Sequence, residues 1–121
     1  MKTVAMVLFP QFLLLDMAGP MEVFSIANRY LPPEQHYALI TLGTDHGQLR
    51  ASNGVSVKAD LHIDQADGHY DLLLVPGGPA AYNDKPALLL EWLKGAVSRA
   101  GQYGSICTGA FVLGFAGLLD G

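Results

Sequence analysis

The sequence predicts an α/β fold with a mostly parallel sheet and helices on both of its faces. Three observations predict it. Several short apolar runs are continuous rather than alternating, as in strands that are buried on both sides. These runs alternate with segments of helical periodicity, and Gly or Pro follows most of them. Alternation of this kind builds a parallel sheet. The 121 residues, half of them apolar, are enough for one domain, expected to span residues 1–121.

Each element has its own signal in the sequence. Buried strands are expected at residues 3–9, 37–42, 71–75 and 102–106. Asn53-Gly54 joins two short runs and predicts a β-hairpin of residues 49–52 and 55–59. Residues 61–70 are expected to be irregular. Helices are expected at about 20–30, where Gly19-Pro20 is typical of a helix start, and at 86–100 and 107–118.

Composition excludes several classes of protein. The net charge is −4 and the seven Lys and Arg are scattered, which argues against a nucleic-acid surface in this segment. The longest apolar stretch, residues 106–119, is too short for a membrane span, and the first apolar run favours a strand over a signal peptide. A single cysteine suits the reducing cytoplasm. Residues 117–121 indicate a helix end and a turn, so we expect a domain that is incomplete at its carboxyl end.

Cys107, the one cysteine, is the first candidate site residue. It lies between a predicted strand and a predicted helix, with the small residues Ser105, Gly109 and Ala110 around it. This is the pattern of a nucleophile elbow, a tight turn that exposes one side chain at the end of a sheet. A helix N-terminus lowers the pKa of a thiol and favours the thiolate. A buried structural cysteine is the alternative.

Gly77 and Gly78 directly follow another predicted strand and its Pro76. Parallel sheets bind ligands at the carboxyl ends of their strands, where these glycines fall. Glycines allow a sharp turn that presents backbone N–H groups without obstruction. We expect the amides of Gly78 and Thr108 to hold an oxyanion or a carbonyl oxygen. The alternative is a tight turn with no further role.

Asp16 is a single charge in an apolar segment, which predicts partial burial and a role as proton donor or acceptor. A solvated surface position and helix N-capping are the alternatives. Glu22 is the rival carboxylate, assigned to a charge role at the helix N-terminus. No metal site is expected, because no pair of histidines has ligand spacing on a regular element. The histidines are His36, His46, His62 and His69, all expected at the surface.

The order of the motifs resembles the ThiJ/PfpI branch of the class I glutamine amidotransferase-like superfamily. The run LLLDMAGPMEVF is followed by DLLLVPGG and SICTGAFVLGFAGLLDG, and the similarity extends along essentially the whole chain. The resemblance implies a flavodoxin-like sandwich, usually a homodimer, with the nucleophile at Cys107 and the acid/base carboxylate at Asp16. Intracellular-protease-like members carry His after the cysteine. Thr108 stands there, so peptidase activity is not expected.

Two groups within the family match best. One is the amino-terminal sensor domain of AraC-type transcription regulators, through its DxAGPxEVFxxAN run at residues 16–28. The other is the isocyanide hydratases, which share DxxGP and SxCTG and form an N-formamide. The first implies a small-molecule sensor without a cofactor, binding DNA only through a separate carboxyl-terminal domain. The second implies a cysteine-dependent hydratase or related carbon–nitrogen hydrolase or lyase. Redox sensing through the thiol is a third alternative. The binding residues would be Gly77, Gly78, Thr108 and Gly109.

Overall fold

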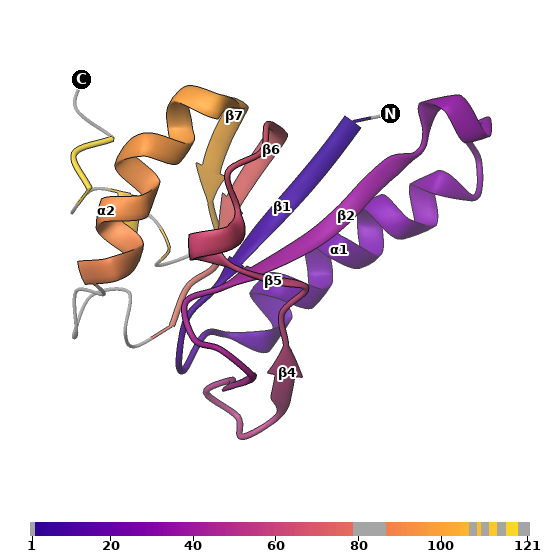
Figure 1. Cartoon of the computed structure of the whole chain (residues 1–121). Coiled ribbons are helices and arrows are strands. Elements are labelled where there is room, and N and C mark those ends of the chain that lie inside the picture. The colour runs from indigo at the N-terminus through magenta and orange to yellow at the C-terminus, as the bar shows by residue number, and fades with distance from the viewer. Residues whose placement is uncertain (1, 79–86, 107–108, 110–111, 114–115, 119–121) are drawn as a thin grey trace.

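A five-stranded parallel sheet forms the centre of the molecule. Figure 1 shows the computed structural model, which describes residues 2–78, 87–106, 109, 112–113 and 116–118. The strand order is β5-β2-β1-β6-β7, and every neighbouring pair is parallel. The predicted α/β class is therefore confirmed. The strands are β1 (Lys2–Leu8), β2 (Tyr37–Gly43), β5 (Leu61–His62), β6 (Tyr70–Val75) and β7 (Ala100–Ser105).

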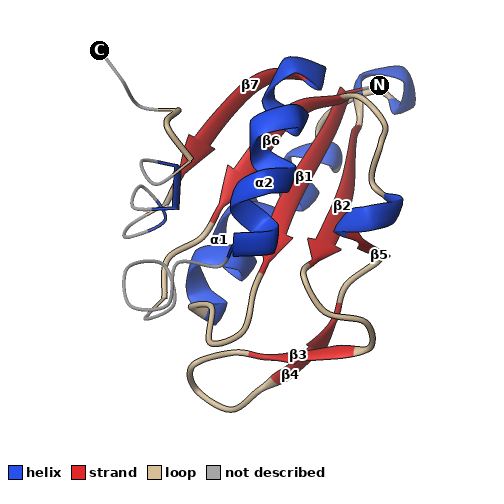
Figure 2. Cartoon of the chain, turned by 60° about the vertical axis from the view of Figure 1, so that its left-hand side comes forward, coloured by secondary structure: helices blue, strands red, loops and turns tan. Residues whose placement is uncertain are grey.

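Two helices cover opposite faces of the sheet. In Figure 2, α2 (Ala87–Ala96) lies in front of the strands and α1 (Leu14–Asn28) lies behind them. The predicted hairpin is also present, as the antiparallel pair β3 (Gln48–Arg50) and β4 (Ser56–Lys58). The described residues also form the 3-10 turns η1 (Pro33–Gln35), η2 (Ile63–Gln65) and η4 (Val97–Arg99).

The first helix begins earlier than the sequence predicts. It starts at Leu14 rather than near Pro20, and the proline lies inside it. Pro usually ends or kinks a helix because it lacks the N–H of the backbone. Here Leu14, Met17 and Met21 pack against the core, so tertiary burial outweighs the local cost of the proline.

Two other boundaries differ from prediction. The segment expected to be irregular, residues 61–70, contains β5 and η2, because β5 pairs with the end of β2 and so gains its structure from a distant strand. The second helix, predicted at 86–100, ends at Ala96. The strand predicted at 102–106 is β7, which begins at Ala100 after a 3-10 turn.

Of the helix predicted at 107–118, the described residues Gly109, Val112 and Leu113 are helical. The predicted end is wrong, because residues 116–117 form a turn and Leu118 is irregular, with Gly117 at a φ of +78°.

The core is centred on β1, as its continuous apolar run predicts. The side chains of Ala5, Met6, Val7 and Leu8 are fully buried. From α2, Leu89 and Leu93 reach the same core. The α1 helix contributes no fully buried residue and leaves the apolar side chains of Leu15, Val23 and Ile26 exposed. Within the described part of the chain, no helix is long and apolar enough to cross a membrane.

Candidate functional site

The candidate site lies where the carboxyl ends of β1, β6 and β7 meet. The Leu13 N–H, at the entrance to α1, donates to the Gly77 carbonyl oxygen at 2.9 Å. The Ile106 N–H, just after β7, donates to the Val75 carbonyl oxygen at 2.9 Å. The turn after β6 is therefore hydrogen-bonded to the segment that follows β1, and the last residue of β6 is hydrogen-bonded to the segment that follows β7.

Asp16 lies in the first turn of α1 and is half-buried, as predicted. Its Oδ2 accepts a hydrogen bond of 3.1 Å from the Gly77 N–H. Among the described residues, Oδ2 is the only oxygen of this carboxylate with a hydrogen-bond partner. The Gly77 amide thus holds the carboxylate in position, and none of the described residues donates to Oδ1.

Gly78 provides a close approach between the turn and the β1–α1 connection. Its φ of +149° is in the region that favours glycine, and a Cβ there would lie 2.5 Å from the Gln11 carbonyl oxygen. Gln11 itself has a φ of +67°, which is uncommon for a residue with a side chain. The Gln11 N–H is fixed by the Arg50 carbonyl oxygen at 2.8 Å, so the hairpin supports this connection.

Gly109 provides a second close approach. A Cβ at this position would overlap the Val75 carbonyl oxygen and would lie 2.7 Å from the Pro76 carbonyl oxygen. Its N–H donates to the Ile106 carbonyl oxygen at 3.0 Å. A glycine is therefore required for this residue to pack on the end of β6 and the turn after it.

The structure brings four of the six predicted site residues together at the carboxyl end of the sheet: Asp16, Gly77, Gly78 and Gly109. Cys107 and Thr108 lie outside the described residues, so their predicted roles stay predictions. The role given to Glu22 is wrong. Because α1 begins at Leu14, the acidic residue of its first turn is Asp16, and Glu22 is exposed further along the helix.

One cluster is not predicted by the sequence. His62, expected at the surface, has a side chain only 8% exposed, and it contacts Asp64 and stacks on His46. Sequence spacing does not reveal this cluster, because the β2–β3 loop and η2 meet only after the sheet has formed. The only pattern that hints at it is the His62-x-Asp64 pair.

Comparison with known proteins identifies the family. The family model described as DJ-1/PfpI matches residues 2–121. The chain belongs to the DJ-1/PfpI family. A Streptomyces lividans protein from the 5′ region of cpoL is 40% identical over 118 residues, covering 98% of this chain and 82% of that protein.

Two further relatives of this DJ-1/PfpI chain have named activities. The HTH-type transcriptional regulator GbdR of Pseudomonas aeruginosa is 29% identical over 120 residues, which are 99% of this chain and 32% of GbdR. The isonitrile hydratase of Pseudomonas putida is 30% identical over 121 residues, which are 98% of this chain and 49% of the enzyme. The chain thus spans about a third of one relative and about half of the other.

Solved structures agree with the fold. A ThiJ/PfpI family protein from Pseudomonas syringae superposes with a TM-score of 0.85 at 21% identity, over 99% of this chain and 48% of that one. Oxidized DJ-1 of Toxoplasma gondii superposes with a TM-score of 0.80 at 25% identity, over 100% of this chain and 64% of that one.

Proposed function

We propose that this DJ-1/PfpI domain is the small-molecule sensor of an AraC-type transcription regulator. The observation that carries the proposal is the similarity to GbdR, which extends along 99% of this chain but covers only 32% of the regulator. The chain's net charge of −4 is consistent with DNA being bound by another part of such a protein. The segment that most resembles the regulators, residues 16–28, begins with Asp16 and lies wholly within α1.

The site supports binding of a small polar molecule. Asp16 offers Oδ1 as an acceptor, and its position is fixed by the Gly77 amide at 3.1 Å. In this proposal the amides of Gly78 and Thr108 bind a ligand oxygen, and Cys107 lies beside it. A ligand that carries both a hydrogen-bond donor and a carbonyl or carboxylate group suits this donor and acceptor set.

A thermal-shift experiment tests the sensor on the full gene product. We would screen a panel of amino acids, small amides and amines against wild type, Asp16→Asn and Glu22→Gln. A sensor predicts at least one compound that raises the Tm of wild type and Glu22→Gln but not of Asp16→Asn, and that is recovered unchanged. A panel with no such compound, together with chemical turnover of a substrate, would contradict the proposal.

A second candidate function is a cysteine-dependent isonitrile hydratase, favoured by the 30% identity to the Pseudomonas putida enzyme. In this mechanism the Cys107 thiolate adds to the terminal carbon of the isocyanide, and Asp16 transfers a proton to the adduct. Water then adds to the carbon of the resulting thioimidate, and the carbon–sulfur bond breaks to release the N-formamide and the Cys107 thiolate, with the remaining proton returned to Asp16. Incubation with tert-butyl isocyanide, followed by NMR of the formyl proton, tests it, with Cys107→Ser as the control.

The homodimer implied by the family resemblance is also a proposal. The outer side of α1 supports it, since Leu15 is 79% exposed and Val23 is 66% exposed. Apolar side chains grouped on one helix are typical of an interface. Light scattering of wild type and of a Leu15→Ser/Val23→Ser double variant measures the oligomeric state. A monomeric wild type would refute the proposal.

A further inference from the structure

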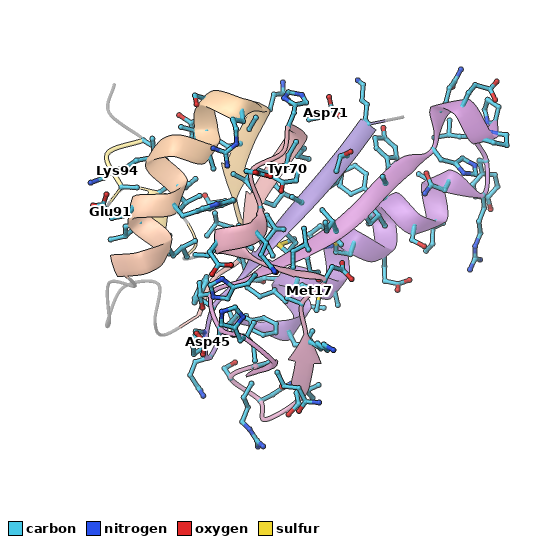
Figure 3. All side chains as sticks on the ribbon, viewed as in Figure 1. Met17, Asp45, Tyr70, Asp71, Glu91 and Lys94 are labelled. Carbon is cyan, nitrogen blue, oxygen red and sulfur yellow. The ribbon has the colours of Figure 1, made fainter. Side chains whose placement is uncertain are left out.

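A side-chain cluster separate from the Asp16 region lies beside β2, at the same carboxyl end of the sheet. His62 is the last residue of β5, Asp64 belongs to η2, and His46 lies in the loop between β2 and β3. One possible ligand atom from each residue lies within 4.8 Å of the other two. Figure 3 shows the neighbouring Asp45 at this edge, far from Asp71 at the amino ends of the strands.

The ring of His62 is held in one orientation. Its Nε2 lies 2.9 Å from the Thr44 carbonyl oxygen, and a carbonyl can only accept, so Nε2 carries the hydrogen. In the neutral ring, Nδ1 then has a lone pair. The Asp64 N–H donates to this Nδ1 at 3.1 Å, which requires the same lone pair. Metal-binding histidines commonly show this arrangement, with the second nitrogen fixed by a carbonyl oxygen.

The same lone pair faces a carboxylate. Nδ1 of His62 lies 2.8 Å from Oδ1 of Asp64. A lone pair and a carboxylate oxygen at this distance repel each other unless a cation binds both. The cation is either a proton or a metal ion, and either one takes the lone pair from the Asp64 N–H and leaves the hydrogen bond from Nε2 to Thr44 in place.

His46 supplies a third ligand from an exposed position. Its Nε2 lies 3.8 Å from Oδ2 of Asp64, and its ring stacks on His62 with centroids 3.9 Å apart. The side chain is 74% exposed, so the ring can turn out of the stack toward the carboxylate at little cost. A hollow of about 140 Å³ beside it is lined in part by Asp45, Asp60 and Lys58. These charged side chains together carry a net negative charge, which favours a cation.

We propose that His46, His62 and Asp64 bind a divalent transition-metal ion of the zinc class. Nδ1 of His62, Nε2 of His46 and the Asp64 carboxylate are the ligands, and water completes a tetrahedral site. Two imidazoles and one carboxylate are a donor set that Zn²⁺ accepts. The ion would join the β2–β3 loop to η2 and so stabilise this edge of the sheet. The site does not depend on the sensor or hydratase proposal.

Calorimetric titration with Zn²⁺ tests the site in a Cys107→Ser background, because a free thiolate also binds zinc. Asp64→Asn should weaken zinc binding about tenfold or more. His69→Ala is the matched control, since His69 and Asp71 form a histidine–carboxylate pair with Nε2 and Oδ1 3.6 Å apart and no third ligand is found for it among the described residues. Zinc affinity should be unchanged in that control.

NMR of the histidine side chains provides a readout that does not depend on a variant. Zinc should shift the ring signals of His62 and His46 at concentrations that leave His36 and His69 unaffected, and it should raise the Tm. If Asp64→Asn and His69→Ala bind zinc equally, or if His62 does not respond before the other histidines, the proposal is wrong.

Discussion

Asp16 and Gly77 are 61 residues apart in the sequence and are joined by a 3.1 Å hydrogen bond from the Gly77 N–H to Oδ2 of Asp16. The Gly77 carbonyl oxygen accepts the Leu13 N–H at 2.9 Å. Both backbone groups of Gly77 thus bind the start of α1. This pair of bonds attaches the helix to the turn after β6 and sets the position of the carboxylate.

Removal of the Asp16 carboxylate should destabilise the protein. Asp16→Ala leaves the Gly77 N–H without its charged acceptor, and hydrogen bonds to charged groups contribute about 1.5–3 kcal/mol. We expect the free energy of unfolding in urea to fall by about 1–2 kcal/mol, since the group is half-buried. Asp16→Asn keeps an acceptor and should lose less. Glu22→Gln, at an exposed position of the same helix, should change stability by less than about 0.5 kcal/mol. Equal losses in all three variants would contradict a specific role.

A side chain at Gly78 should be poorly tolerated. The Cβ of Gly78→Ala would lie 2.5 Å from the Gln11 carbonyl oxygen and 3.0 Å from the Phe12 Cα, and both are backbone atoms that cannot rotate away. We expect a loss of about 2 kcal/mol or more in urea unfolding. Gly95→Ala in α2 is the control, because a Cβ there would meet only the flexible Arg99 side chain, at 3.9 Å. Inside a helix it should stabilise by up to about 1 kcal/mol. A neutral Gly78→Ala would show that the turn can move away from Gln11.

Stability should depend on pH through Asp71. The Thr3 N–H donates to Oδ2 of Asp71 at 2.7 Å, and this bond, with a smaller contribution from His69, lowers the pKa of Asp71 below its ordinary 3.8. A carboxyl group whose pKa is lower in the folded state stabilises the fold above the unfolded pKa. That contribution is lost as pH falls through the folded-state pKa.

The measurement is urea unfolding of wild type and Asp71→Asn at neutral pH and at several values below about 4. The difference between them should be largest at neutral pH and should shrink in acid. Glu34→Gln, at an exposed position, should show no such change. A difference that is constant with pH would mean that the charge of Asp71 contributes nothing.

The thiol of Cys107 should ionise below the ordinary pKa of about 8.5 if it lies at a helix N-terminus. Because it is the one cysteine, the rate of alkylation by iodoacetamide against pH reports this group alone. Cys107→Ser should show no labelling. An ordinary or raised pKa would count against both the sensor and the hydratase, since both use an exposed, activated thiol.

The candidate site is predictable in part, for physical reasons visible in particular residues. Gly77 and Gly78 are recognisable because a glycine pair after a buried strand permits a sharp turn at the end of the sheet, and Asp16 because a lone charge in an apolar run predicts partial burial. The partner itself, the Gly77 N–H, is a long-range contact that no local pattern encodes. Glu22 was misassigned for the same reason, since packing against the core sets the start of α1.

The amino-acid sequence alone determined the α/β class, the burial of β1 and the hairpin at Asn53-Gly54. These follow from local burial and turn chemistry, which each short segment carries within itself. Only the tertiary structure decided that α1 continues through Pro20, that β5 forms beside β2, and that His46, His62 and Asp64 meet. Each of these depends on contacts between distant segments, whose free energy appears only once the sheet has assembled.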